Sequence, residues 1–494
     1  MQNKRQAGLL LSVTALPGKY GIGDFGPSAF QFIDLLKSAG FSLWQILPLN
    51  PLGYGNSPYQ PYSSFAIDEQ FVDLDELVSL GLIKEVVPED IIEGKVRYDR
   101  VKEFKLKYLK EAYENFLKQE GAGKILKDFV AEHSWARDWS VFMAFKRIYP
   151  SSWNEWPKAA QDWIVSRKKG TKEEEKARNF EVFLQYTLYR QWEKVHAYAK
   201  EKEILIMGDV PFYVGFDSVD VWANQDTFLL DEETHLPSSV AGVPPDYFSA
   251  TGQRWGNPIY DWKKLEANGF DFVLNRIYLN SLLYDVIRLD HFRAFDTYWM
   301  IPASCPTAVD GEWIEAPGYA FFDTLLGKYP DLQIVAEDLG DLRPEVLELR
   351  DHYDFPGMNV IQFTFEDCEL FHKGDWNRVN SVAYLDTHDN DTMLSYFYLL
   401  PEQKQGDWLR AWAQLGIAIG SPVERMIVYS MRKPANLAVL SMQDILELDT
   451  IARTNVPGIV DDRNWTWKLS DFEGFKAKIP FLHDLILATG RFTK

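Results

Sequence analysis

The chain has 494 residues, of which 46% are hydrophobic and 25% are charged, a composition that excludes a disordered protein. Its 52 Lys and Arg residues against 72 Asp and Glu residues give a formal net charge of −20. This negative field repels nucleic-acid phosphates and anionic lipid headgroups, so we expect neither a nucleic acid nor a membrane as a partner.

Eight short apolar segments predict the strands of a parallel barrel. They are rich in β-branched and aromatic residues, and most precede polar segments that contain Gly or Pro. In chain order they are Gly8–Val13, Ser42–Leu47, Ile204–Asp209, Leu283–Asp290, Gln333–Glu337, Asn359–Phe365, Val382–Asp389 and Leu437–Asp444. Helical patterns lie between many of them, including Ser28–Ala39 and Pro344–His352. Apolar strands that alternate with helices indicate an α/β protein with a covered parallel sheet, and the number eight favours a closed (β/α)₈ TIM barrel.

The uneven spacing of the strands predicts two insertions into a single catalytic barrel unit, residues 1–494. Residues 51–200, approximately, are rich in helix formers and predict a mainly helical subdomain. Residues 211–275, approximately, are rich in Pro, Gly and aromatic residues and predict a loop-rich subdomain. About fifty residues follow the eighth strand, too few for a β-sandwich of roughly 100 residues, so we expect no C-terminal β-sandwich.

Cysteine usage and the N-terminal segment indicate a reduced, cytoplasmic protein. The two cysteines, Cys305 and Cys368, form no C-x-x-C motif, which argues against a disulfide framework and a structural zinc site. Lys4 and Arg5 precede the apolar segment Ala7–Leu11, as in a secretory signal. That apolar segment is very short and has strand character, so we interpret it as the first strand. No run approaches the roughly 18 apolar residues of a membrane span.

Three acidic residues lie at or near the carboxyl ends of predicted strands, where TIM barrels build their active sites. They are Asp290 in VIRLDHFR, Glu337 in IVAEDLG and Asp389 in YLDTHDNDT. A barrel would bring all three to one face. Paired carboxylates are the usual equipment for cleaving a glycosidic bond, one as acid/base and the other as nucleophile or base. The three acids therefore predict a catalytic site that acts on carbohydrate.

Two other interpretations of these acids remain open. Asp often caps the N-terminus of the helix that follows a strand. Barrels also gather acids and histidines around a divalent cation. Arg288 and His291 flank Asp290, and His388 adjoins Asp389. The chain has no H-E-x-x-H motif and no tight Asp-rich loop, so we expect no metal and no cofactor.

The segment Gly21–Gly26 matches the G-x-G-x-x-G pattern of a dinucleotide-binding turn. In such a turn the glycines follow the strand immediately, whereas here Pro17 and a polar loop intervene. Asp24 would also put a negative charge where a pyrophosphate should lie. We interpret the segment as a flexible loop between the first strand and the first helix.

Aromatic residues make up 15% of the chain, and the most informative lie in polar loops that contain Gly or Pro. Tyr54 and Tyr59 follow the second predicted strand, and Tyr247 and Trp255 lie in the second insertion. A sugar ring stacks its C–H face on an aromatic ring while its hydroxyls bind polar groups. These loops are therefore candidate sugar-binding surfaces.

An ordered series of longer motifs runs along the chain. The motifs are GLLLSVTALPG, FSLWQILPLNPLGYGNSPYQ, GDVPFYVGFDSVDVWAN, GVPPDYFSATGQRWGNPIYDW, IRLDHFRAF, IVAEDLG, FPGMNVIQFTF, THDNDT, RTNVPG and NWTWKL. Through them the chain resembles the amylomaltases, the bacterial 4-α-glucanotransferases, over essentially its whole length. The resemblance implies a barrel with inserted subdomains and no C-terminal β-sandwich. It also implies an enzyme that acts on α-1,4-glucans and maltooligosaccharides, with another glucan or glucose as acceptor.

The resemblance implies a role for each of twelve residues and a remote site at one more. Asp290 matches the nucleophile, Glu337 the general acid/base, and Asp389 the acid that stabilises the distorted sugar in the transition state. Arg288, His291 and His388 match residues that hold the nucleophile and the donor sugar. The positions expected near the substrate are Tyr59, Asp209, Gln253, Trp255 and Asn455, with Tyr247 on a mobile lid loop over the cleft. Tyr54 matches a position used for a secondary glucan site.

Three residues depart from the family pattern. Asp386 stands where a small residue is expected before T-H-D, Met393 where a second Thr is common, and Asn56 where Asp is common. None removes a catalytic group, but Asp386 would add negative charge near Asp389 and alter its titration. Two rival functions remain: an α-1,4-glucan hydrolase that uses the same carboxylates, and a glucan-binding protein without catalysis.

Overall fold

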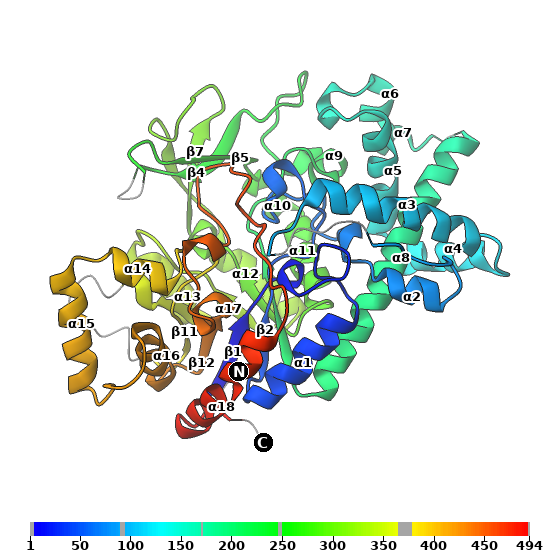
Figure 1. Ribbon diagram of the computed structural model, residues 1–494. Coiled ribbons are helices and arrows are strands. Elements are labelled where there is room, and N and C mark those ends of the chain that lie inside the picture. The colour runs from blue at the N-terminus through cyan, green and yellow to red at the C-terminus, as the bar shows by residue number, and fades with distance from the viewer. Residues whose placement is uncertain (1–3, 89–93, 169–170, 246–248, 364–377, 493–494) are drawn as a thin grey trace.

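Eight parallel strands close into a barrel at the centre of the molecule (Figure 1). The computed structural model describes residues 4–88, 94–168, 171–245, 249–363 and 378–492. Around the barrel the strands follow the order β1, β12, β11, β10, β9, β6, β3, β2. Their bounds are β1 Gln6–Leu10, β2 Leu43–Gln45, β3 Leu205–Val210, β6 Val286–Leu289, β9 Ile334–Ala336, β10 Gly357–Val360, β11 Ser381–Tyr384 and β12 Leu437–Ser441. Each predicted strand overlaps one of these, which confirms the predicted (β/α)₈ TIM barrel.

Several predicted strands continue too far, most of all the sixth and the seventh. β11 ends at Tyr384, well short of the end of the predicted Val382–Asp389. Beyond it the side-chain oxygen of Asn390 accepts hydrogen bonds from the backbone N–H and the hydroxyl of Thr387, which closes a turn. The sixth predicted strand likewise gives way to a 3-10 turn at Ile361–Phe363, and its residues 364 and 365 are not among those described.

Side chains alternate between the inside of the barrel and the helices around it. Met207 and Val286 belong to the apolar cluster that fills the inside. Their neighbours Ile206 and Ile287 belong to the clusters that pack outward against helices. The barrel is therefore a packed core, and its strand ends hold the polar side chains described below.

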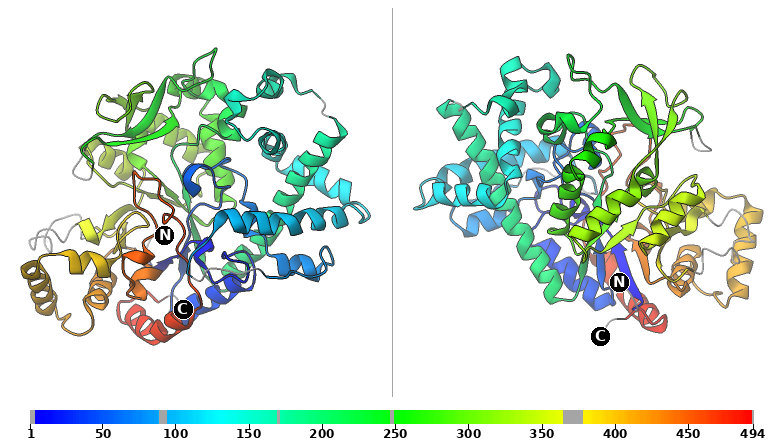
Figure 2. Two further views of the ribbon diagram at one scale, coloured as in Figure 1. Left: turned by 45° about the horizontal axis from the view of Figure 1, so that its top comes forward. Right: turned by 180° about the vertical axis from the view of Figure 1, so that it is seen from behind.

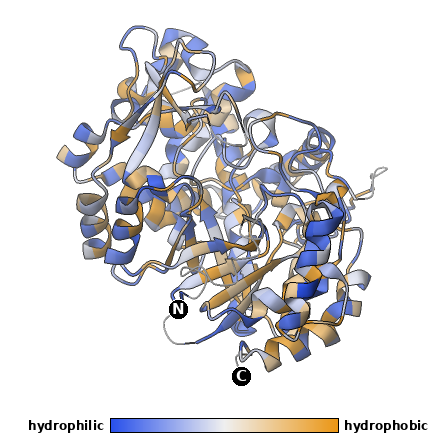
Figure 3. Ribbon diagram, turned by 90° about the vertical axis from the view of Figure 1, so that its left-hand side faces the viewer, coloured by the Kyte–Doolittle hydropathy of each residue, from blue (hydrophilic) through white to orange (hydrophobic). Residues whose placement is uncertain are grey.

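The helices that follow the strands cover the barrel in both further views (Figure 2). The predicted helices are observed as α1 (Pro27–Ala39) and α13 (Pro344–His352). Pro27 suits the first position of α1, where its missing N–H has no partner to lose, and Gly40 ends the helix with φ of 90°. Figure 3 shows such helices with hydrophilic residues on one face and hydrophobic residues on another. The others on this part of the chain are α11 (Asp271–Ser281), α12 (Gly318–Lys328), α14 (Met393–Leu399), α15 (Glu402–Gln414), α16 (Pro422–Arg432) and α17 (Met442–Ile445).

Between β2 and β3 the described residues form seven α-helices, at the right of Figure 1. They are α2 (Leu74–Ser79), α3 (Tyr98–Phe116), α4 (Ala122–Glu132), α5 (Trp135–Ile148), α6 (Lys158–Gln161), α7 (Trp163–Ser166) and α8 (Lys172–Glu201). A capping box of Thr171 and Glu174 begins α8. α8 packs against α5 and α1 and so joins these helices to the barrel.

The segment Gly21–Gly26 is the loop before α1, as predicted, and all of its residues are buried. The ammonium group of Lys105 in α3 donates to Asp24 Oδ2 at 2.9 Å and to two backbone oxygens at 2.7 and 2.8 Å. A Cβ on Gly23 would lie 1.9 Å from a backbone oxygen. The glycines therefore allow close backbone packing.

A four-stranded antiparallel sheet lies at the top of Figure 1. Its strands in spatial order are β5 (Gln253–Pro258), β4 (Ser239–Val243), β7 (Thr297–Pro302) and β8 (Glu312–Glu315). Two short helices, α9 (Val219–Ala223) and α10 (Trp262–Ala267), lie in the same part of the chain. Sequence patterns do not predict this sheet, because β5 contains Gly256 and Pro258 and β4 pairs with β7, a strand that follows β6.

After β12 the described residues form α17, a 3-10 turn and α18 (Glu473–Ala488), without a further sheet strand. α18 packs against α1, and both chain ends lie at the bottom of Figure 1. Within the described part of the chain, no helix combines the length and the apolar character needed to span a bilayer.

Candidate active site

A buried ion pair between Arg288 and Asp209 forms the floor of the site. Arg288 follows Val286 by two residues in β6, and Asp209 follows Met207 by two residues in β3, so both side chains point into the barrel. The two residues are also partners in the β3–β6 register. Arg288 Nη1 donates to Asp209 Oδ1 at 2.8 Å and Oδ2 at 2.6 Å, and this pairing offsets the cost of burying two charges.

The same guanidinium holds two of the predicted catalytic acids. Arg288 Nη1 lies 3.1 Å from Asp290 Oδ1, and Arg288 Nη2 lies 4.0 Å from Glu337 Oε1. Backbone hydrogen bonds that extend the sheet fix both acids, since Asp290 N donates to Val210 O at 3.1 Å and Glu337 N donates to Leu289 O at 3.0 Å. Adjacent strand ends thus bring Asp290 and Glu337 together.

Of the two acids, Glu337 has the stronger tendency to hold a proton. Burial raises its pKa well above the ordinary value, Arg288 opposes that shift, and Asp290 adds to it. Burial also raises the pKa of Asp290, but the guanidinium bonds to Asp290 directly. The negative charge therefore belongs on Asp290 and the proton on Glu337. The backbone N–H of His291 donates to Glu337 Oε2 at 2.6 Å, which leaves the other oxygen to hold the proton.

Asp389 lies on the loop after β11, on the other side of the site. Asn455 Nδ2 donates to its Oδ1 at 2.6 Å, and Arg453 Nη2 donates to its backbone oxygen at 2.7 Å. His388 Nε2 lies 3.4 Å from Asp389 Oδ2. Burial lowers the pKa of His388, so this histidine is neutral at pH 7. With 45% of its side chain exposed, Asp389 is open to a ligand.

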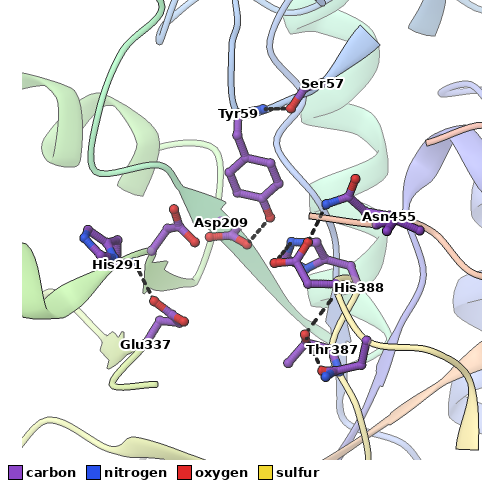
Figure 4. A network of polar contacts seen from close by, with 12 residues as sticks. Ser57, Tyr59, Asp209, His291, Glu337, Thr387, His388 and Asn455 are labelled. Atoms are coloured by element: carbon purple, nitrogen blue, oxygen red, sulfur yellow. Dashed lines mark hydrogen bonds and ion pairs between the residues drawn. The ribbon is translucent and has the colours of Figure 1, made fainter. Parts of the chain in front are cut away.

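Tyr59 connects the two sides. Its hydroxyl donates to Asp209 Oδ2 at 2.8 Å, and its ring stacks on His388 with centroids 5.2 Å apart. Figure 4 shows Tyr59 and Asp209 between His291 and Glu337 on one side and His388 and Asn455 on the other. The polar residues predicted from separate motifs therefore form one connected network.

The four-stranded sheet supplies an aromatic wall through β5. The Trp255 indole packs edge-on against His291, with centroids 4.9 Å apart at 84°. Its N–H donates to Gln253 Oε1 at 3.1 Å. Burial lowers the pKa of His291 to about 3, so its ring is neutral. His291 Nε2 is buried and has no hydrogen-bond partner among the described residues.

Two predicted residues do not join this network. Tyr54 begins a 3-10 turn with 77% of its surface exposed. Tyr247 lies outside the described residues, so the predicted lid position has no structural description.

Of the three departures from the family pattern, Asp386 was expected near Asp389. Its side chain instead contacts Asp444 of α17. Its side chain faces the neighbouring strand exit because β12 lies beside β11.

Three residues of the network were not predicted individually. Arg453 also donates from Nε to the backbone oxygen of Asn455 at 2.7 Å. Gln60 Nε2 donates to Asn257 Oδ1 at 2.7 Å and so joins the second-strand loop to β5. Trp465 packs on the rings of Tyr59 and His388. The segments that contain them carry the family motifs, but their contacts depend on loop paths.

The barrel and this site define a class of protein, a (β/α)₈ enzyme that cleaves glycosidic bonds with carboxylates. Burial raises the pKa of Glu337 more strongly than that of Asp290, as a general acid beside a nucleophile requires, and aromatic rings lie beside the two acids. Among the described residues no group of three or more His, Cys, Asp or Glu side chains is arranged to hold a metal ion.

Comparison with known proteins narrows this class. A family model described as 4-alpha-glucanotransferase matches residues 11–473. The 4-alpha-glucanotransferase of Aquifex aeolicus is 41% identical over 99% of each chain, and that of Synechocystis is 40% identical over 95% of this chain and 94% of the relative. The solved structure of the amylomaltase from Streptococcus agalactiae in complex with acarbose matches with a TM-score of 0.93 and 33% identity, over 99% of this chain and 100% of that one.

The chain therefore belongs to the 4-alpha-glucanotransferase family, the amylomaltases. Its activity is that of a glucan transferase, and the alternative of a hydrolase is not favoured. The chloroplastic/amyloplastic 4-alpha-glucanotransferase of Solanum tuberosum is 38% identical over 99% of this chain and 87% of the relative.

Proposed function

We propose that the chain transfers segments of α-1,4-glucans by double displacement with retention, with Asp290 as nucleophile and Glu337 as general acid/base. The contact of Arg288 with both acids is the observation that supports this most strongly. It holds Asp290 ionised for attack while burial keeps the proton on Glu337. The donor would be a maltooligosaccharide, and the acceptor another glucan or glucose.

The two steps use one proton in turn. In the first, an Asp290 oxygen bonds to the anomeric carbon, the glycosidic C–O bond breaks, and the Glu337 proton moves to the leaving 4-oxygen. In the second, Glu337 takes the proton from the 4-hydroxyl of the acceptor, whose oxygen displaces Asp290 from the anomeric carbon. The configuration is inverted twice and is therefore retained.

Asp389 would act on the sugar itself, because charge develops on the ring in the transition state. Its hydrogen bond from Asn455 and the neighbouring His388 hold the carboxylate in place. Sugar hydroxyls would bind these residues together with Tyr59, Asp209, Arg288, His291 and Gln253.

Transfer requires that an acceptor outcompetes water. Water is present at ~55 M, so an acceptor at ~1 mM needs a preference of more than four decades, about 6 to 7 kcal/mol at 1.4 kcal/mol per decade. Stacking on Trp255 would contribute roughly 0.5 to 1.5 kcal/mol beyond buried area. Tyr247 is a proposed lid residue that excludes water, and Tyr54 a proposed secondary glucan contact.

Incubation of the pure protein with maltotriose tests the proposal. We expect glucose together with maltopentaose and longer chains, with little net gain in reducing ends. Shorter sugars alone would overturn it, because water would then be the acceptor. Asp290→Asn should abolish all products and still bind maltotriose in calorimetry, which separates loss of the nucleophile from loss of the fold.

We also propose a reduced, cytoplasmic location, which rests on the cysteine usage of the chain. Fractionation of source cells with an antibody against the protein would test it. Recovery outside the cytoplasmic fraction would contradict it.

A further inference from the structure

Two buried acids join the exits of neighbouring strands beside the catalytic loop. Asp386 follows β11 on the loop that carries His388 and Asp389, and Asp444 lies in α17, directly after β12. β11 and β12 are adjacent parallel strands, so their exits lie side by side. Asp386 is 4% exposed and Asp444 is fully buried.

Their hydrogen bonds leave one oxygen on each acid unsatisfied. Asp444 Oδ1 accepts from Met393 N at 2.9 Å, at the start of α14. The two carboxyl groups are within hydrogen-bonding contact of each other. Asp386 Oδ1 and Asp444 Oδ2 are buried without a partner among the described protein groups. Two ionised carboxylates are acceptors only, so this contact between them would be repulsive.

Among the described residues, neither acid forms an ion pair with a basic group, and the strongest interactions of both are with other acids, Ser441 and backbone N–H groups. The other charged group acting on Asp444 is Asp391, also an acid, and the groups acting on Asp386 are Asp444 and Ser441. Arg453 and His388 line the same cavity as Asp386. Arg453 donates instead to the backbone oxygens of Asp389 and Asn455.

The titration of both acids agrees with this geometry. Burial and the neighbouring Asp444 raise the pKa of Asp386 well above its ordinary value. Burial raises the pKa of Asp444 to about 6. His388 is buried and its pKa is lowered, so it adds no positive charge to the cavity at neutral pH.

We propose that Asp386 and Asp444 share one proton, and that the resulting O–H···O hydrogen bond positions the loop that carries His388 and Asp389. Both are positioning residues, since neither belongs to the network around Asp290 and Glu337. The effect on catalysis rests on the proposed role of Asp389, whereas the shared proton does not.

The pH dependence of unfolding tests the shared proton. A group whose pKa is raised on folding contributes stability at low pH and loses it as the pH rises through the folded value. Each such proton lowers the folding constant about tenfold per pH unit between the unfolded and folded pKa values. In Asp386→Asn the side-chain amide N–H can donate to Asp444, so no shared proton is needed. Above about pH 6 the free energy of unfolding, measured with urea, should therefore fall with pH less steeply than in the wild type, by the equivalent of about one proton.

If the free energy of unfolding changed equally steeply with pH in the wild type and in Asp386→Asn, the proposal of a shared proton would be overturned. Asp220→Asn is a matched control, because Asp220 is a buried acid whose Oδ2 accepts from Ser64 and whose pKa is raised to about 6. Its substitution should change the slope only near and below that pH. If Asp386→Asn fails to fold, Asp444→Asn serves as the second variant with the same expected slope.

Transfer kinetics with maltotriose test the positioning role. Asp386→Ala removes the bond, and a loop displaced by about 1 Å should cost up to a hundredfold in kcat. Asp386→Asn restores the bond and should restore kcat. Equal kcat values for wild type, Asp386→Ala and Asp386→Asn would overturn the positioning role. If the unfolding slope changes while kcat does not, the shared proton stands and only the positioning role fails.

Discussion

At the scale of single residues, one guanidinium decides which acid carries the proton. Arg288 bonds to Asp290 at 3.1 Å but lies 4.0 Å from Glu337, so its charge favours ionisation of Asp290 more strongly. Burial acts on both acids and raises the pKa of Glu337 well above its ordinary value. The nucleophile and the acid are thus differentiated by a side chain that lies beneath both.

The protonated state of Glu337 predicts a pH dependence that differs between donors. With maltotriose, the rate should fall as the pH rises through the pKa of Glu337, because the leaving oxygen then receives no proton. With an α-maltosyl fluoride, fluoride leaves without protonation, so this fall should largely vanish. Glu337→Gln should lower the maltotriose rate by about 10² to 10⁴. Equally steep falls with both donors would contradict the assignment.

The sequence predicts the acids better than it predicts their partners. Asp290 and Glu337 directly follow apolar strands, and the barrel geometry then places them on one face. The contacts of Asn455 and Arg453 with Asp389 depend on the path of a loop that no periodic pattern describes. Asp386 illustrates the limit, because its partner Asp444 lies in α17, directly after the strand that neighbours β11 in space.

At the scale of elements, the Lys105–Asp24 pair anchors α3 to the loop before α1. The Lys105 side chain is fully buried. Lys105→Ala should destabilise the fold by about 3 to 5 kcal/mol, because it leaves the buried carboxylate of Asp24 without its charged partner. Lys124→Ala is the control, since Lys124 and Asp128 are exposed and should leave the melting temperature unchanged. Equal melting temperatures for wild type and Lys105→Ala would refute the anchoring role.

The four-stranded sheet should govern the choice between an acceptor sugar and water. Trp255→Ala removes an aromatic face worth roughly 0.5 to 1.5 kcal/mol, so the ratio of transfer to hydrolysis should fall about two- to tenfold. Trp313→Ala, in β8 of the same sheet, is the matched control and should keep the ratio. Counting reducing ends against longer oligomers gives the measurement. If Trp255→Ala left the ratio of transfer to hydrolysis unchanged, the Trp255 side chain would have no role in acceptor binding.

At the scale of the whole molecule, the barrel follows from strands that are apolar on both faces. Residues such as Met207 inside and Ile206 outside are both buried, which makes each strand a continuous apolar run in the sequence. The four-stranded sheet cannot be predicted from apolar runs, because β4 pairs with β7 far along the chain and β5 contains Gly256 and Pro258. Local patterns report periodicity and burial, whereas distant pairing depends on the assembled fold.

The most direct test of the account is to trap the glycosyl group on the protein. Glu337→Gln incubated with an α-maltotriosyl fluoride should form the covalent intermediate and release it slowly, because the base of the second step is missing. Intact-protein mass spectrometry should then show the added sugar, and peptide mapping should locate it on Asp290. Consumption of the fluoride without an adduct, or an adduct on another acid, would contradict the assignment of Asp290 as nucleophile.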